Sequence, residues 1–479
     1  MRGLHGRALM EERRKRQALF AIMLSVFLAA MEATVVATAM PKVVGSLGGL
    51  HMYSWVFSGF LLTSTVTMPL WGRLSDLFGR RPMYLIGLAV FLAGSALSGM
   101  ARDMVELIVF RMVQGLGAGS LITIGMTIVG DLFGLERRAR MQGYISGVWG
   151  VASLVGPLIG GLLTDHVSWR WVFYINLPFG AVAMALLAVT LTGDAGVRRR
   201  PTIDYAGLAL FTVAVSSLLL GVMEGGRAPS WTRADVLTPV AVGVLALVAF
   251  VLVERRAADP IVPLALFANR IVLAAVSTGF LAGMAMFGAI SFVPLFLQSV
   301  ARTSATQAGF ALTPFTLGWV ALSVTSARLV LRIGYRPVVL AGMICLTGAF
   351  ALLSRWDAGL TLGDAMRDML VAGIGMGLNM VPMLIAVQSS VPRTQLGIAT
   401  SMTQFFRTVG GTLGLSVMGA VMAHRLTAGL PMAVALHGVF VVGLVVCVVA
   451  LAAAFLVPAG TARDLARADM RGEPTRAGG

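Results

Sequence analysis

Two ionisable side chains lie inside long apolar stretches of this sequence. Glu32 lies in the middle of the first stretch, and Arg111 lies about one third of the way into the fourth. Charge at membrane depth is costly, so each residue is a functional candidate. Burial favours the protonated form of a carboxyl group, so Glu32 can serve to bind a proton or a cationic substrate. The alternative is a purely structural carboxylate that a neighbouring helix neutralises.

Arginine keeps its proton in proteins, so Arg111 can act only by pairing or by changing the proton affinity of a neighbour. Paired with Glu32 in one conformation and not in another, it would couple proton binding to movement. A permanent salt bridge or snorkelling of the side chain toward lipid headgroups is the alternative. Arg407, in the thirteenth stretch, is open to the same two interpretations, function and snorkelling.

A short charged turn separates the second and third apolar stretches and contains Gly72, Asp76, Gly79, Arg80 and Arg81. The glycines permit a tight turn between two helices. Asp76 can cap a helix end or pair with arginines, and would then form a reversible cytoplasmic latch. Arg80 and Arg81 are also explained by a simpler role, which is to hold this loop on the inner side of the membrane.

The fifth apolar stretch contains Gly156, Pro157, Gly160 and Gly161. Glycines spaced by four residues allow a helix to pack closely against a neighbour, and the proline kinks it. The pattern predicts close packing, or a hinge at this position.

The amino-acid composition indicates that these residues lie in a membrane protein. The chain has 479 residues, of which 57% are hydrophobic and 12% charged, whereas soluble domains carry about 25% charged residues. Long apolar segments in lipid must be helices, because lipid cannot satisfy backbone polar groups. We predict an all-α integral membrane protein with fourteen transmembrane helices, at 17–41, 54–74, 83–101, 104–130, 140–164, 170–192, 203–224, 236–254, 271–298, 308–331, 337–355, 366–390, 395–423 and 433–457.

The net charge of +16 does not indicate a nucleic-acid partner. Basic residues form short clusters in alternate loops between apolar segments, which predicts that both termini are cytoplasmic. Cys345 and Cys447 lie in predicted spans without a CxxC motif or a His/Cys cluster, so we expect no disulfide and no metal. Without a phosphate-binding Gly-x-x-x-x-Gly-Lys-(Ser/Thr) loop, we expect no cofactor and a proton gradient as the energy source.

The charged turn at 72–82 returns in altered form at 327–337, with Leu331 in place of Asp76 and Tyr335 in place of Arg80. Other glycine motifs recur at nearly the same offset, which indicates a duplicated unit. The segments between the copies have no counterpart. We therefore predict a basic cytoplasmic tail at 1–16, a six-helix bundle at 17–192, two inserted central helices at 203–254, a second six-helix bundle at 271–457 and a disordered cytoplasmic tail at 458–479.

Together these motifs resemble the major facilitator superfamily, and within it the 14-span drug:proton antiporters. The turn at 72–82 is similar to the superfamily's loop signature, with Leu77 where a basic residue is usual. Arg111-x-x-Gln114-Gly115 is similar to the fourth-span arginine motif, and the segment from Gly143 to Gly161 to the antiporter motif. The segments 31–41 and 169–178 resemble first-span and sixth-span motifs of the 14-span group.

The resemblance implies a major facilitator fold and proton-driven efflux of amphipathic drugs, lipophilic cations or neutral compounds across a bacterial inner membrane. Proton coupling would fall to Glu32 and Arg111, and Met31, Glu32 and Gln114 would line the substrate cavity. We expect small-molecule substrates, protons and lipid as partners, and a monomer. The alternatives are a dedicated exporter of an endogenous lipid, antibiotic or siderophore and, from another class, a membrane enzyme or sensor.

Overall fold

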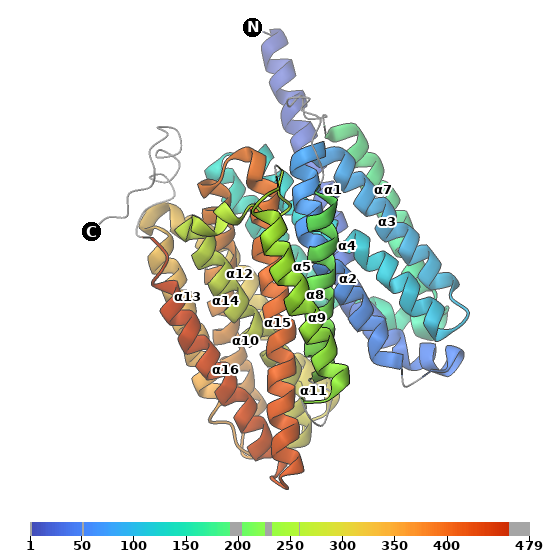
Figure 1. Cartoon of the computed structure of the whole chain (residues 1–479), viewed down its shortest axis with the longest axis vertical. Coiled ribbons are helices and arrows are strands. Elements are labelled where there is room, and N and C mark those ends of the chain that lie inside the picture. Colours follow the sequence, from blue (N-terminus) through green and yellow to red (C-terminus); the bar gives the residue numbers. More distant parts are fainter. Residues whose placement is uncertain (1, 50–51, 192–203, 226–231, 258, 459–479) are drawn as a thin grey trace. The chain divides into compact units, whose positions relative to one another are not determined.

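The computed structural model describes residues 2–49, 52–191, 204–225, 232–257 and 259–458, and every regular element in them is a helix (Figure 1). Nearly all of the predicted tail at 458–479 lies outside the described residues. The helices are α1 (Arg2–Leu47), α2 (Tyr53–Phe78), α3 (Arg80–Met100), α4 (Met104–Leu132), α5 (Leu135–His166), α6 (Trp171–Tyr174), α7 (Asn176–Thr190), α8 (Tyr205–Gly225), α9 (Ala234–Glu254), η2 (Leu264–Ala268), α10 (Arg270–Ser299), α11 (Ala305–Phe310), α12 (Thr313–Ile333), α13 (Tyr335–Leu353), α14 (Leu362–Ser390), η3 (Arg393–Gln395), α15 (Leu396–Thr427) and α16 (Met432–Ala454).

Each of the fourteen predicted apolar segments overlaps helix in the described residues, although fewer qualify as membrane spans. By length and apolar composition, 11 helices in the described residues can cross a membrane. The number rises to 12 when the two bent parts of α1, Met10–Glu32 and Thr34–Leu47, count as one span. The long helices α2 and α5 fall outside this set, because polar and charged residues interrupt their apolar surface.

The chain divides into two compact units. The first comprises residues 1–134, 147–203 and 393–401, and the second comprises 135–146, 204–392 and 402–479. The first unit therefore contains α1 to α4, most of α5, α6, α7 and the start of α15. The second contains the start of α5, α8 to α14, the rest of α15 and α16.

In the first unit, α4 packs tightly between α2 and α3, and glycines make this possible. A Cβ atom placed on Gly115 would lie 2.5 Å from the carbonyl oxygen of Phe60 on α2. One on Gly117 would lie 2.3 Å from the backbone nitrogen of Phe91 on α3. Because α4 carries glycine toward both neighbours, it can occupy the interior of the unit and present Arg111 there.

In the second unit, α14 packs against α12 and α13 in the same manner. A Cβ atom on Gly373 would lie 2.1 Å from the Phe315 carbonyl oxygen of α12, and one on Gly375 would lie 2.8 Å from the Gly342 carbonyl oxygen of α13. The pair α8–α9, which has no counterpart in the first unit, contacts α15 through Phe211, whose ring centroid lies 5.6 Å from that of Phe405.

The two copies of the charged turn share a backbone conformation. Gly79 joins α2 to α3 with φ of 94°, and Gly334 joins α12 to α13 with φ of 89°. Positive φ in this range is strained for residues with a side chain, which explains why glycine stands at both positions.

Candidate functional site

The structure brings Glu32 and Arg111 together inside the first unit. Glu32 lies where α1 bends by 40°, and the Nη1 atom of Arg111 on α4 donates a hydrogen bond to the Glu32 Oε1 atom. Both side chains are 1% exposed. A buried carboxylate and a buried guanidinium neutralise each other at this position, so neither charge remains uncompensated in the apolar interior.

Further contacts fix the orientation of Arg111. Its Nη1 atom also donates to the Gln114 Oε1 atom at 2.8 Å, one helical turn along α4. Its Nε atom donates to the Val56 carbonyl oxygen of α2 at 3.4 Å, and its guanidinium carbon lies 4.2 Å from the centre of the Phe60 ring. The guanidinium is thus held from three directions and faces Glu32.

A residue that the sequence analysis did not single out completes this cluster. Asn176, the first residue of α7, donates through Nδ2 to the Glu32 Oε2 atom at 2.8 Å and to the Ser95 Oγ atom of α3 at 2.9 Å. Its Oδ1 atom is buried and has no hydrogen-bond partner among the described residues. The signal in the sequence is an amide side chain within the otherwise apolar stretch 171–178. Each oxygen of Glu32 therefore has a donor.

The glycines of α5 lie against α1 just beyond Glu32. A Cβ atom on Gly156 would lie 2.1 Å from the Thr34 Oγ1 atom, and one on Gly160 would lie 2.2 Å from the Thr38 Oγ1 atom. Gly161 faces open space, and Pro157 lies within α5 between the two contacts. This geometry accounts for close packing of α5 on α1, and the predicted hinge stays a prediction.

The predicted cavity residues have different surroundings. Met31 is 1% exposed and lies against α5, with its Cγ atom 3.5 Å from a Cβ atom placed on Gly156. Gln114 is fully buried, and its backbone packs against Gly94 of α3. Met31 precedes Glu32 in the chain, and Gln114 shares the hydrogen-bonding partner Arg111 with Glu32. The role of both residues toward a substrate stays a prediction.

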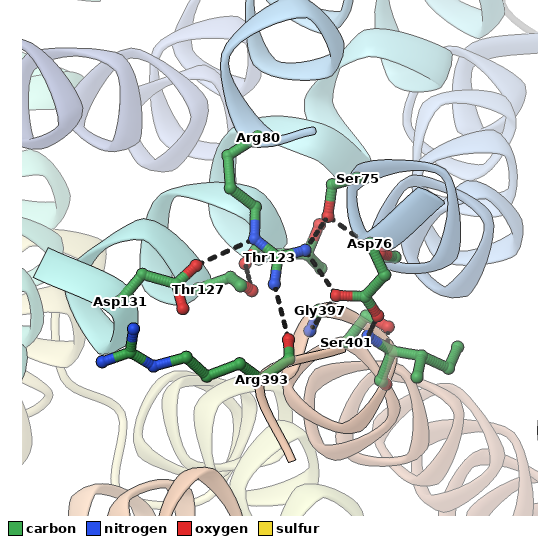
Figure 2. Close-up of polar contacts among 11 residues, drawn as sticks. Ser75, Asp76, Arg80, Thr123, Thr127, Asp131, Arg393, Gly397 and Ser401 are labelled. Atoms are coloured by element: carbon green, nitrogen blue, oxygen red, sulfur yellow. Dashed lines mark hydrogen bonds and ion pairs between the residues drawn. The ribbon is translucent and has the colours of Figure 1, made fainter. Parts of the chain in front are cut away.

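A second charged cluster forms at the turn between α2 and α3, and Figure 2 shows its polar contacts. We call Ser75, Asp76, Arg80 and Asp131 the latch cluster. Arg80 pairs with Asp76, donates through Nε to the Asp131 Oδ2 atom at 2.9 Å, and donates through Nη1 to the Ser75 Oγ atom at 2.9 Å. It thereby links α2, α3 and α4.

The latch cluster also binds the beginning of α15. Asp76 accepts hydrogen bonds from the backbone N–H groups of Gly397 and Ile398, at 2.9 and 2.8 Å, and Arg80 donates to the Arg393 carbonyl oxygen at 3.3 Å (Figure 2). The first N–H groups of a helix have no partner within it, and the helix dipole favours negative charge there. Asp76 thus caps α15.

Glycines bring the two backbones close enough for this cap. A Cβ atom on Gly397 would lie 2.4 Å from the carbonyl oxygen of Gly72 on α2. Arg81 points away from the contacts described for the latch cluster and donates to the Ala188 carbonyl oxygen of α7 at 2.6 Å. Of the five residues predicted at this turn, Gly72, Asp76, Gly79 and Arg80 shape the cluster or its backbone.

Arg407 lies on α15 in the second unit and differs from the other deep arginine. Its one hydrogen-bond contact within the described residues is from Nη1 to the Met380 Sδ atom of α14, at 3.1 Å. No group of three or more His, Cys, Asp or Glu side chains that could hold a metal ion occurs in the described part of the chain.

Comparison with known proteins places this arrangement in a family. The model of the Major Facilitator Superfamily matches residues 22–415, and the chain belongs to that superfamily, whose members are membrane transporters. The chain is 41% identical over 408 residues to the multidrug transporter protein MdtP of Bacillus subtilis, covering 84% of this chain and 74% of that protein.

Other relatives and a solved structure agree with the family. Multidrug resistance protein 3 of Bacillus subtilis is 34% identical over 406 residues, covering 85% of this chain and 79% of that one. The efflux pump FUS6 of Gibberella moniliformis is 30% identical over 423 residues, covering 86% and 74%. The crystal structure of the human organic anion transporter MFSD10 has the same fold, with a TM-score of 0.64, 18% identity, and coverage of 90% of this chain and 99% of that chain. This protein is therefore a multi-pass membrane transporter of small molecules and not an enzyme.

Proposed function

We propose that this transporter exports amphipathic small molecules in exchange for protons. The buried Glu32–Arg111 pair, with Asn176 on the second carboxylate oxygen, is the observation that carries the proposal. Deprotonated Glu32 has a donor for each oxygen, whereas a protonated Glu32 would lose its charge pair with Arg111. Proton binding would thus release α1 from α4, and the bend at Glu32 is where α1 would move.

The latch cluster would provide the second conformational control. Asp76 holds the first turn of α15, and α15 continues into the second unit from Met402 onward. Breaking this cap would free α15, and reforming it would close the cytoplasmic side. In this proposal Arg80 pairs with the Asp76 carboxyl group and orients it, while Arg81 holds the loop on the inner side.

We further propose the finer topology of a 14-span antiporter, with α2 and α5 crossing the membrane as well. The protein would reside in a bacterial inner membrane with both termini cytoplasmic, would act as a monomer, and would need no cofactor beyond the proton gradient. Multidrug export is supported by the two Bacillus relatives, which are named as a multidrug transporter and a multidrug resistance protein.

The test measures drug-driven proton release in inverted vesicles that contain the full chain. Glu32→Gln keeps the side-chain size and two polar atoms but cannot take up a proton. We expect the exchange rate to fall at least about 100-fold, as is typical when a group essential to proton transfer is removed. Glu106→Gln, which alters an exposed helix-capping contact at the start of α4, is the control and should exchange normally. Wild-type exchange by Glu32→Gln would refute the mechanism.

A dedicated exporter of an endogenous product is the second candidate. One relative, 32% identical over 408 residues, is named as the MFS-type transporter of the acurin A biosynthesis cluster of Aspergillus aculeatus. A susceptibility panel in an efflux-deficient strain separates the two candidates, because a multidrug exporter protects against several unrelated compounds. A dedicated exporter would protect against one chemical class or none.

A further inference from the structure

Arg407 is a charged side chain deep within a helix of the second unit. It follows Leu396, the first residue of α15, by eleven positions, which places it about 17 Å along the helix axis. The hydrocarbon core is about 30 Å thick, so this position is near its middle when α15 crosses the bilayer. Snorkelling serves arginines close to helix ends. It does not account for an arginine at this depth.

The guanidinium of Arg407 has no anionic partner in the described part of the chain. Its Nη1 atom contacts the Met380 Sδ atom, and a thioether sulfur is only a weak acceptor. The other nitrogens have no hydrogen-bond partner among the described residues. By contrast, Arg111 is neutralised by Glu32, and Arg80 by Asp76 and Asp131. Among these three arginines, Arg407 alone carries an uncompensated charge.

The helix that faces α15 leaves room for this side chain. A Cβ atom on Gly283 of α10 would lie 2.2 Å from the Arg407 carbonyl oxygen and 3.1 Å from its Cγ atom. One turn further along α15, Gly411 packs directly on the ring of Phe287 of α10. The side chain therefore lies where α10, α14 and α15 meet, and the residue as a whole is only partly buried.

We propose that Arg407 binds the carboxylate of transported amphipathic molecules, so that anionic or zwitterionic compounds are among the substrates. An unpaired charge at membrane depth costs several kcal/mol and is retained where it has a function. The planar guanidinium matches a carboxylate through two parallel hydrogen bonds. Met380 and Phe287 offer polarisable and aromatic surface for the apolar body of the ligand. The inference rests on the proposed export function and names one class of its substrates.

The experiment measures binding rather than transport. The full chain in phosphatidylcholine nanodiscs is titrated with dansylaminoundecanoic acid and, separately, with its methyl ester, and empty nanodiscs supply the blank. The ester keeps the fluorophore and the alkyl chain and lacks only the carboxylate. We expect the wild-type protein to bind the acid more tightly than the ester. Equal or tighter binding of the ester overturns the proposal without any variant.

Variants of Arg407 test whether this residue causes the preference for the acid over the ester. Arg407→Gln should weaken binding of the acid about tenfold, the value of one strong charge-assisted interaction, and reduce the ratio of the two affinities to near one. Arg407→Lys keeps a charge without the planar fork and should lose about threefold. Arg355→Gln, an exposed arginine between α13 and α14, is the matched control and should keep the wild-type ratio.

The outcomes separate this proposal from the proton-coupled mechanism. A wild-type ratio of the two affinities in Arg407→Gln overturns the carboxylate site, even when Glu32→Gln abolishes exchange. Normal exchange by Glu32→Gln refutes proton coupling through Glu32, even when the binding ratio depends on Arg407. When Arg407→Gln fails to fold, the wild-type comparison of acid with ester and the Arg407→Lys titration still decide the question.

Discussion

The two units use the same glycines at matching helix contacts but distribute charge differently. Gly160 of α5 packs against Val35 of α1, and its repeat Gly414 of α15 packs against Met284 of α10. Glu32 precedes Val35 by three residues, and the residue that precedes Met284 by three is Leu281. Leu281 therefore occupies the position in the second unit that corresponds to Glu32. The close helix packing occurs in both units, whereas the acid to which we assign proton exchange occurs in only one.

The same contrast holds on the helices that face these positions. Arg111 of α4 corresponds to Met369 of α14, and Gln114 corresponds to Ala372, at the constant offset of the glycine motif. The second unit instead has Arg407 on α15, where the first unit has Ser153 on α5. At these positions one unit contains a neutralised acid–base pair, and the other contains a cation without an anionic partner in the described part of the chain. A neutralised pair suits proton exchange, and a lone cation suits an anionic ligand.

The largest effect expected from this comparison is on stability. Arg111→Leu leaves Glu32 buried without its partner, and removal of one member of a buried pair costs about 3 to 5 kcal/mol. Arg407→Leu removes a charge that has no anionic partner among the described residues, so stability should be unchanged or higher. Thermal unfolding of the purified variants in detergent measures both.

A double variant tests whether the stability lost in Arg111→Leu comes from the unpaired Glu32 charge or from poorer packing of the new side chain. Glu32→Leu/Arg111→Leu removes both charges and should regain most of the stability that Arg111→Leu loses, while exchange stays abolished. If Arg407→Leu is as destabilised as Arg111→Leu, the Arg407 charge has a partner in the folded protein and the contrast between the units fails.

A smaller effect is expected at the copied turns, where the first unit has Asp76 and the second has Leu331. Asp76→Asn removes the charge that caps α15 and pairs with Arg80, and charged hydrogen bonds of this kind contribute about 2 kcal/mol. Leu331→Asn alters no such contact. We expect α15 to leave the latch cluster roughly 30 times more often in Asp76→Asn, since about 1.4 kcal/mol corresponds to a factor of ten.

Cysteine labelling reports this opening. Ser401, which is buried against Gly72 at the start of α15, is replaced by cysteine in a chain whose Cys345 and Cys447 are replaced by alanine. Maleimide modification should accelerate in the Asp76→Asn background and stay slow in the Leu331→Asn background. Equal rates in the two backgrounds would show that Asp76 does not hold α15.

The sequence predicted the helices well because lipid permits few alternatives for a long apolar segment. It also selected Glu32 and Arg111, since charges at such depth are rare, and Asp76, since a topology role does not explain an acid. The number of membrane spans was harder to predict. The helices α2 and α5 are long enough to cross a membrane, but they contain polar residues that pack against other helices or belong to the latch cluster.

Contacts between residues that are far apart in the chain could not be predicted from the sequence. Asn176 is one amide among many polar residues, and only the fold shows that α7 begins beside Glu32 and Ser95. The partner of Asp76 was likewise hidden, because Gly397 lies 321 positions away and contributes a backbone N–H group that any residue type could supply. Arg407 was visible in the sequence, but only the structure shows that no carboxylate lies beside it in the described residues.

The smallest effect expected is at two buried asparagines, one in each unit. Asn176→Leu removes a donor to the Glu32 carboxylate, and we expect about 1.5 kcal/mol of lost stabilisation and roughly tenfold slower exchange. Asn379 of α14 is 2% exposed and its Nδ2 atom has no hydrogen-bond partner in the described part of the chain, so Asn379→Leu should change exchange less than twofold. Exchange in inverted vesicles measures both. Asn176→Asp should slow exchange further, because it replaces the donor to Glu32 with a second carboxylate. If Asn176 were only structural, this nearly isosteric change would leave the exchange rate as it is.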